Sequence, residues 1–236
     1  MRANLDGTNV ETLLSGSSFI GQMDLDTLNN KLYYVTSVLT PTGAWGRQIN
    51  RMNLDGTSQQ TLFEANPENI PNSVVSDLAV DGANGFIYWL NGNGGDSIGK
   101  ATITGGGADQ VVLLQNTGIG APIDIVVSPL GDYVYWSNNN LQNSVQRVRS
   151  NGQDREILVT GVQLPLGFDI DFAAGKMYWT NNEDSDPVAS GYQGTIQRAN
   201  LDGTQIETIV AGLNTDTSFI YLTSLALGIV ANSPTT

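Results

Sequence analysis

One heptapeptide occurs three times in this chain at a regular spacing. Arg-Ala-Asn-Leu-Asp-Gly-Thr occupies residues 2–8 and 198–204, and Arg-Met-Asn-Leu-Asp-Gly-Thr occupies residues 51–57. Weaker copies lie at residues 100–106 and 147–152, so a basic residue recurs at positions 2, 51, 100, 147 and 198. A spacing of about 49 residues falls within the range of roughly 20 to 50 that is typical of repeat architectures. We therefore expect a series of similar units.

Each unit contains four short runs with the composition of β-strands, which we name a, b, c and d in chain order. Strand b carries the aromatic runs at residues 87–89, 134–136 and 177–179, with an imperfect copy at residues 32–35. Strand c leads into the heptapeptide, and its Asp-Gly pair fits a tight turn to strand d, because Asp and Gly tolerate a positive φ. Apolar runs before the aromatic pair and after the Asp-Gly pair supply strands a and d.

Four-stranded units repeated around an axis make a β-propeller, an all-β fold of antiparallel blades. Residues 2–14 supply only strands c and d, four complete units follow, and residues 221–227 supply a final strand a, with 228–232 as a short strand b. The two half units add up to one more blade, so we count five repeats, with six as the alternative. Pairing of the N-terminal strands with the C-terminal strand closes the ring. We predict one domain over residues 1–231, with residues 232–236 as a tail or the start of a linker.

Adjacent strand residues point to opposite faces of a sheet, so a Tyr-Trp pair on strand b fills the gaps toward both neighbouring blades. We therefore predict that Trp89, Trp136 and Trp179 belong to the core. Trp45 lies outside the repeat register, in a Gly-rich stretch. It is either an exposed anchor for a ligand or a plug within its loop.

The charge and composition exclude several classes of function. The chain of 236 residues has a formal net charge of −13 and contains no His and no Cys. This charge opposes binding to nucleic acid. We expect no membrane insertion, because no apolar run approaches the roughly 20 residues of a membrane span. This composition rules out disulfides, metal sites made of Cys or His, and His-based catalysis. We also expect a monomer.

The repeated residues resemble the YWTD repeats, also called low-density-lipoprotein receptor class B repeats. The family pattern runs from an apolar strand ending in Asp, through Tyr-Trp-Thr-Asp, to Ile-x-Arg-Ala-Asn-Leu-Asp-Gly. Residues 196–203 match the last part in full, and residues 78–81 with 87–89 match the earlier part well. The resemblance implies a non-enzymatic domain of an extracellular or cell-surface protein that binds another protein or stabilises neighbouring modules.

Two departures from the family pattern bear on the site. The last position of Tyr-Trp-Thr-Asp is Asn91, Asn138 and Asn181 here, and Thr36 in the first copy. The resemblance implies a structural carboxylate at this place, so the local hydrogen bonds must differ. Family propellers have six blades, whereas the chain contains five recognisable units.

Loop length favours one face of the predicted ring as the binding face. The a–b and c–d turns are short, whereas the b–c and d–a connections on the opposite face are long, and long loops on a rigid repeat scaffold usually bind partners. The long-loop face is acidic and rich in amides, which suits a basic or polyhydroxylated partner, although solvated loops are the alternative. The candidate binding residues are Trp45, Asp96, Glu183, Asp184, Asp186 and Tyr192.

A metal site is a second hypothesis. Asn91, Asn138 and Asn181 occupy equivalent places at the ends of strand b, and Ca²⁺ prefers oxygen ligands. A carboxylate such as Asp96 or Asp184 would have to join them. In the alternative interpretation, the three Asn side chains cap strand ends and bond to nearby backbone.

The repeated cations need partners, because five equivalent positive charges would otherwise repel each other. We predict that each cation bonds to a carboxylate or carbonyl of its own or the next blade, with an anion-binding ring as the alternative.

These patterns favour a non-catalytic binding or scaffold module with a protein or glycan partner, in an extracellular or cell-surface setting. The alternative function is a metal-assisted hydrolase or lyase with its site at the channel mouth, because catalysis without His or Cys needs Asp or Glu helped by a metal. The sequence contains no nucleophile–base motif that favours the enzyme.

Overall fold

The computed structural model describes residues 1–15, 20–39, 43, 45–65, 74–92, 97–115, 122–139, 143–183 and 192–215. Within these residues it contains sixteen strands, arranged as four antiparallel sheets of four strands each. The strands of each sheet follow one another in chain order from the inside to the outside. This arrangement confirms the prediction of four complete four-stranded units, which we call blades one to four.

The strand boundaries follow the four runs predicted for each unit. Blade one contains β1 (Ile20–Asp26), β2 (Lys31–Leu39), β3 (Trp45–Asn53) and β4 (Gln60–Glu64). Blade two contains β5 (Val74–Asp81), β6 (Phe86–Gly92), β7 (Ser97–Thr102) and β8 (Val111–Leu114). Blade three contains β9 (Pro122–Val127), β10 (Tyr133–Asn138), β11 (Ser144–Arg149) and β12 (Glu156–Thr160). Blade four contains β13 (Phe168–Asp171), β14 (Lys176–Glu183), β15 (Tyr192–Asn200) and β16 (Glu207–Thr215).

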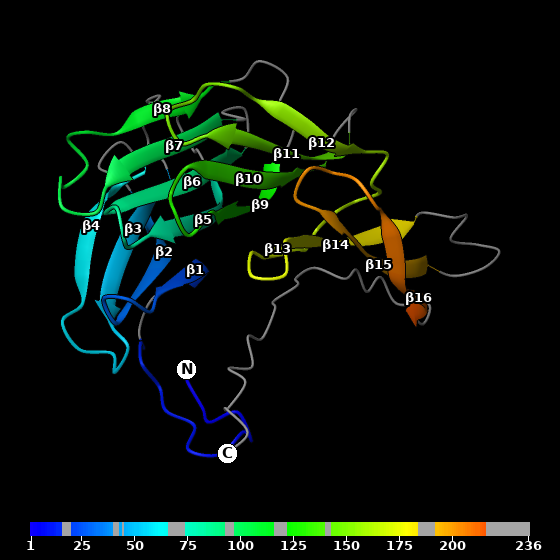
Figure 1. Cartoon of the computed structure of the whole chain (residues 1–236). Coiled ribbons are helices and arrows are strands. Elements are labelled where there is room, and N and C mark those ends of the chain that lie inside the picture. Colours follow the sequence, from blue (N-terminus) through cyan, green and yellow to red (C-terminus); the bar gives the residue numbers. More distant parts are fainter. Residues whose placement is uncertain are drawn as a thin grey trace, which may run out of the picture.

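The four blades follow one another along an arc (Figure 1). Their inner strands β1, β5, β9 and β13 lie next to one another around the centre, and their outer strands β4, β8, β12 and β16 lie at the periphery. The N-terminal segment lies below β1 in Figure 1, and no described strand fills the space between it and blade four. Four blades and an open gap are therefore what the described residues form.

The heptapeptide forms the predicted turn between strands c and d. In blade one the Asp55 carboxylate accepts hydrogen bonds from the backbone N–H and the hydroxyl of Thr57, at 2.9 and 2.6 Å. The Thr57 hydroxyl also accepts a bond from the Asn53 amide at 2.8 Å. Gly56 has a φ of 83°, which a residue with a side chain adopts only at a cost. The same bonds recur in the copies at residues 2–8 and 198–204.

The core consists of layers between neighbouring blades. Trp89, Trp136 and Trp179 are each 0% exposed, which confirms their prediction as core residues. The layer between blades one and two, for example, joins Tyr33 and Ile49 of blade one to Leu78 and Trp89 of blade two. Because each layer needs side chains from two blades, a blade is stable only next to its neighbours.

The N-terminal segment is a half blade in contact with blade one. Arg2 and Glu11 form an isolated antiparallel bridge, as expected for strands c and d of a unit whose strands a and b are elsewhere. Leu13 and Leu14 pack against Leu32 and Tyr34 of blade one. Residues 216–236, which include the predicted closing strands, lie outside the described residues.

In the part of the chain that the structure describes, we find no helix long and apolar enough to span a bilayer.

Candidate functional site

Four of the five repeated cations connect their unit to the next blade. Arg2 donates to the carbonyl oxygen of Leu54 at 2.9 Å, Lys100 donates to that of Ser150 at 2.8 Å, and Arg147 donates to that of Leu201 at 3.3 Å. Arg51 reaches the carbonyl oxygen of Ile103 at 3.5 Å. In each case the acceptor lies in the c–d turn of the following blade. The prediction that these cations bond to a neighbouring blade is confirmed for these four residues.

A second partner of most of these cations lies on strand d of their own blade. Arg147 pairs with Glu156 at 2.8 Å, and Arg198 pairs with Glu207 at 2.5 Å. The Arg147 guanidinium also lies over the ring of Tyr133, 4.6 Å from its centroid, and Lys100 lies over Phe86 at 4.0 Å. The positive charges are therefore balanced by carboxylates, carbonyls and aromatic faces. Because the cations already have these partners, they offer little positive charge for binding an anion.

Four aspartates on the inner strands line the central channel. Asp24, Asp77, Asp124 and Asp169 come from β1, β5, β9 and β13 and border a cavity of about 420 Å³. All four side chains are partly accessible. This is the main concentration of carboxylates that the sequence analysis did not identify.

Three of these carboxylates bond to the inner strand of the next blade. Asp24 accepts from the backbone N–H of Val80 at 2.8 Å. Asp77 accepts from Ile125 at 2.9 Å, and Asp124 accepts from Phe168 at 2.9 Å. Positions on each inner strand can be counted back from the Asp that ends strand a in blades one and two, and from the equivalent position in the other blades. On this count, the residue that donates the backbone N–H lies one position nearer the end of its strand than the Asp that accepts the bond. The inner strands therefore keep one register around the channel.

Burial and mutual repulsion disfavour the charged forms of these carboxyls. Burial, then the charge of Asp124 and a hydrogen bond with it, raises the pKa of Asp77 well above the usual range. Burial also raises the pKa values of Asp24 and Asp124. The hydrogen bond between the two carboxyl groups favours the protonated form of Asp77 and the charged form of Asp124. A carboxylic acid beside a carboxylate is a proton-sharing pair, and such pairs serve structural as well as catalytic roles.

The four channel aspartates do recur in the sequence, but they are divided between two positions of the repeat. Asp77 and Asp124 lie four residues before the equivalent positions Asp81 and Ser128, whereas Asp24 and Asp169 lie two residues before Asp26 and Asp171. No single position of the repeat therefore carries an aspartate in every unit. Only the packing of the inner strands brings the four side chains to one cavity.

The three candidate asparagines are buried within their own blades. Asn91 accepts a hydrogen bond from the Trp89 indole at 3.0 Å and donates to Ser97 at 3.0 Å. Asn181 accepts from the backbone N–H of Gln163 at 2.8 Å. The polar atoms of Asn138 have no hydrogen-bond partner among the described residues. Asn181 therefore bonds to nearby backbone, whereas both partners of Asn91 are side chains. These bonds test neither the strand-end interpretation nor the calcium hypothesis.

The other candidate binding residues lie at or beyond strand ends on the predicted long-loop face. Trp45 begins β3 opposite Leu39 and is 51% exposed. Glu183 ends β14 and Tyr192 begins β15, so these two residues flank the same connection. Asp96, Asp184 and Asp186 lie outside the described residues. Among the residues that are described, no group of three or more Asp or Glu side chains is close enough to hold a metal ion.

Comparison with known proteins finds several chains of similar sequence. The chain is 22% identical to low-density lipoprotein receptor-related protein 1 of Pyricularia oryzae, over 96% of this chain and 82% of that protein. It is 28% identical to human low-density lipoprotein receptor-related protein 5 over 80% of this chain, and 24% identical to protein cueball of Drosophila willistoni over 70%. The chain spans only 11% and 25% of the lengths of those two proteins. No model of a known protein family matches it.

Solved structures support the same fold. A chain in the crystal structure of the nidogen/laminin complex superimposes with a TM-score of 0.63 at 19% identity, over 83% of this chain and 66% of that one. The β-propeller domain of the trilobed protease from Pyrococcus furiosus, which has an open velcro topology, superimposes with a TM-score of 0.54 at 9% identity. It covers 81% of this chain and 57% of that one.

The four-stranded blades around a central channel, together with these similarities, define the chain as a β-propeller. In its repeats and its relatives it resembles the low-density-lipoprotein receptor class B, or YWTD, propellers.

Proposed function

We propose that this propeller is a non-catalytic binding or scaffold module of an extracellular or cell-surface protein. It recognises a protein or carbohydrate partner through the face that carries the b–c and d–a connections. Two relatives are named as receptor-related proteins, and one structural neighbour is part of a nidogen/laminin complex, which supports a protein partner. The net charge of −13 favours a basic or polyhydroxylated surface on that partner.

One observation carries this proposal: the polar side chains of the repeat are used by the framework itself. The repeated cations, the Asp-Thr turn networks and the channel carboxylates all bond within the ring, as described above. The b–c and d–a connections differ in length and sequence between units, and variable loops on a rigid scaffold are where binding specificity is usually found. Trp45, half exposed at the start of β3, supports a contact on that face.

A binding screen on the two faces tests this proposal. The chain would be applied to arrays of extracellular-matrix proteins and glycans, with Trp45→Ala as the variant on the proposed face. Leu130→Ala is the matched control, because Leu130 is 82% exposed in an a–b turn on the opposite face. We expect Trp45→Ala to weaken binding to a positive array component and Leu130→Ala to leave it unchanged. The reverse result would place recognition on the short-turn face.

The second candidate function is a metal-assisted hydrolase or lyase at the channel mouth. The four aspartates around the channel cavity are the observation that favours it, because carboxyl groups can act as acid and base, but among the described residues no three of them lie close enough to hold the metal by themselves. Two measurements separate the candidates: thermal unfolding in excess calcium, and hydrolysis of a panel of lactones with calcium present. Calcium-dependent turnover that disappears in Asp77→Asn would replace the non-catalytic assignment by the enzymatic one.

A further inference from the structure

The asparagine at the end of strand b is fully bonded in blade two. Asn91 accepts a hydrogen bond from the Trp89 indole at 3.0 Å and donates to the Ser97 hydroxyl at 3.0 Å. The indole lies over Gly99, the residue opposite Trp89 on strand c, because a Cβ at Gly99 would lie 2.2 Å from the ring. An indole in this position therefore needs a residue without a side chain opposite it.

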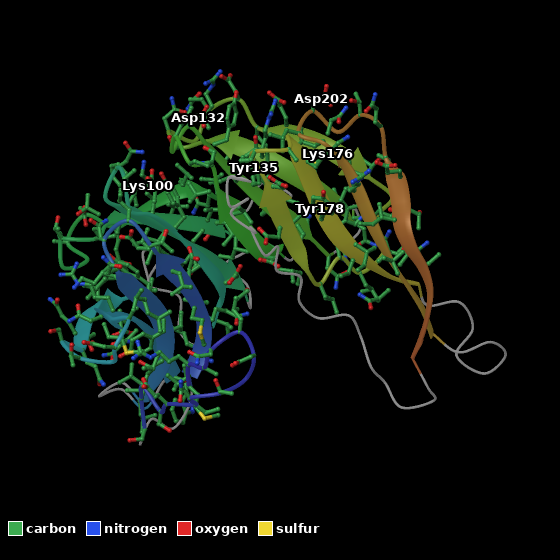
Figure 2. The ribbon with its side chains drawn as sticks, turned by 60° about the horizontal axis from the view of Figure 1, so that its bottom comes forward. Lys100, Asp132, Tyr135, Lys176, Tyr178 and Asp202 are labelled. Atoms are coloured by element: carbon green, nitrogen blue, oxygen red, sulfur yellow. The ribbon has the colours of Figure 1, made fainter. Side chains whose placement is uncertain are left out.

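The equivalent residues of blade three have lost these bonds. Trp136 and Asn138 are 0% and 1% exposed. In the part of the chain that the structure describes, the Trp136 indole nitrogen and both amide atoms of Asn138 have no hydrogen-bond partner. Tyr135, the neighbour of Trp136 on β10, points toward blade four (Figure 2), so Trp136 points toward blade two. Asn138 lies on the same face as Trp136, because the two residues are two positions apart on one strand.

A glutamine opposite Trp136 explains the difference between the blades. Gln146 lies opposite Trp136 on β11, so the indole cannot cover this position as it covers glycine in blade two. The Gln146 amide nitrogen donates to the Ser144 hydroxyl at 2.7 Å, and its oxygen accepts two bonds from Arg155, at 3.0 and 2.8 Å. Gln146 therefore uses the serine that bonds to the asparagine in blade two, and its own oxygen already has a partner.

Blade four also has a glutamine at this place, but its asparagine stays bonded. Gln197 lies opposite Trp179, and its oxygen accepts from Asn181 at 2.6 Å. This oxygen is available because blade four has Ile206 at the position of Arg155. The Trp179 indole nitrogen is the one atom of this pair without a hydrogen-bond partner among the described residues.

The unpartnered atoms of blade three define which ligand they can take. Buried polar atoms are costly unless a partner satisfies them. The indole and amide nitrogens are donors, which disfavours a metal ion, and the amide oxygen is an acceptor, which disfavours an anion. A water molecule both donates and accepts, and buried waters typically have about three protein partners. Trp136 and Asn138 together offer three such atoms, whereas Trp179 offers one.

We propose that Trp136 and Asn138 bind a buried water molecule between blades two and three. This water accepts a hydrogen bond from Trp136 Nε1 and donates one to Asn138 Oδ1, so it replaces the direct bond between tryptophan and asparagine in blade two. The Asn138 amide nitrogen donates to the same water or to a second one. At the position where the resemblance to YWTD repeats implies a structural carboxylate, solvent thus completes the hydrogen bonds of Asn138.

A crystal structure of the unaltered chain tests this proposal without any substitution. We expect an ordered water within hydrogen-bond distance of both Trp136 Nε1 and Asn138 Oδ1. A direct bond between these two side chains, or protein groups that bond to both of them in place of a water, would overturn the proposal.

A double-mutant cycle gives an independent readout in solution. The variants are Trp136→Phe, Asn138→Leu and the two combined, compared by thermal midpoint. Because either substitution alone removes the bridge, we expect the double variant to lose less than the sum of the two single losses. Trp179→Phe with Asn181→Leu is the matched control, because it has the same spacing on strand b but Asn181 bonds to Gln197 instead. Its losses should add.

The comparison of the two cycles decides the outcome. Additive losses at positions 136 and 138 would show that no shared water joins the two side chains. The same departure from additivity in both cycles would show that it arises from packing, and would equally contradict the proposal.

Discussion

The turn glycine of blade four gives a sharp test of how tightly the blades pack. Gly203 lies in the c–d turn between β15 and β16 with a φ of 82°. A Cβ at this position would lie 2.0 Å from the carbonyl oxygen of Leu158 and 2.8 Å from its carbonyl carbon, both on β12 of blade three. The obstacle is backbone, so it cannot rotate away as the end of a flexible side chain does. Gly203→Ala must therefore either strain the turn or separate blades three and four.

The expected loss of stability has two parts. A non-glycine residue in a left-handed conformation costs about 1–2 kcal/mol. Overpacking of a close contact adds about 1–3 kcal/mol. Gly203→Ala should therefore destabilise the protein by about 2–5 kcal/mol. Gly175→Ala is the matched control, because Gly175 lies in the a–b turn of the same blade with a φ of 65° and no atom within 4 Å of an added Cβ. It should cost only the first part.

Thermal and urea unfolding measure this difference. For a protein of this size, 1 kcal/mol shifts the midpoint by about 2–4 °C, so Gly203→Ala should melt roughly 2–12 °C below Gly175→Ala. The equivalent glycines provide a graded series, with the Cβ of Gly56 at 2.9 Å from Leu13 and that of Gly152 at 2.6 Å from Leu113. A Gly203→Ala variant that is no less stable than Gly175→Ala would show that close backbone contact does not hold these blades together.

Three further predictions concern charge and the chain ends. The pKa of Asp77 is raised in the folded state, so the folded protein binds this proton more tightly than the unfolded chain does. The Asp77 carboxyl therefore stabilises the folded state at pH values below its unfolded pKa, and this stabilisation is lost as the pH rises through its folded pKa. Asp77→Asn removes the repulsion with Asp124, so it should stabilise the protein at neutral pH and make the thermal midpoint depend less on pH. An unchanged dependence of the midpoint on pH would argue against an interaction between Asp77 and Asp124. Arg147→Gln, which loses its partners Glu156 and Leu201, should cost about 1–2 kcal/mol in urea unfolding, whereas Arg149→Gln at an exposed pair should cost less. Equal losses would mean that the contact with the next blade adds nothing. Deletion of residues 1–14 should give insoluble or oligomeric protein by size-exclusion chromatography, because it bares the face of blade one; a soluble, cooperatively folding monomer would contradict this.

Features encoded within one repeat were predictable from the sequence. The strand runs, the Asp-Gly turn and the buried Trp89 all depend on residues within about 50 positions of one another, and the repetition of each pattern made it stand out. The partners of Arg147 were also predicted in kind, because a repeated cation needs a repeated acceptor.

Features formed between repeats were not predictable in the same way. The bond between Asp77 and Asp124 joins two blades, and neither residue marks a motif within its own unit. The repeat bookkeeping predicted that the chain ends meet, but it did not locate the cavity that the four aspartates border. That cavity is defined by what the neighbouring blades leave open.

By itself, the sequence determined the blade: four strands, their order, their turns and the aromatic residues between sheets, because these follow from local alternation and turn chemistry. The tertiary structure alone decided how the blades face one another, and with that the ring of channel aspartates. The physical reason is that this ring consists of side chains and backbone groups that meet only after whole sheets have packed.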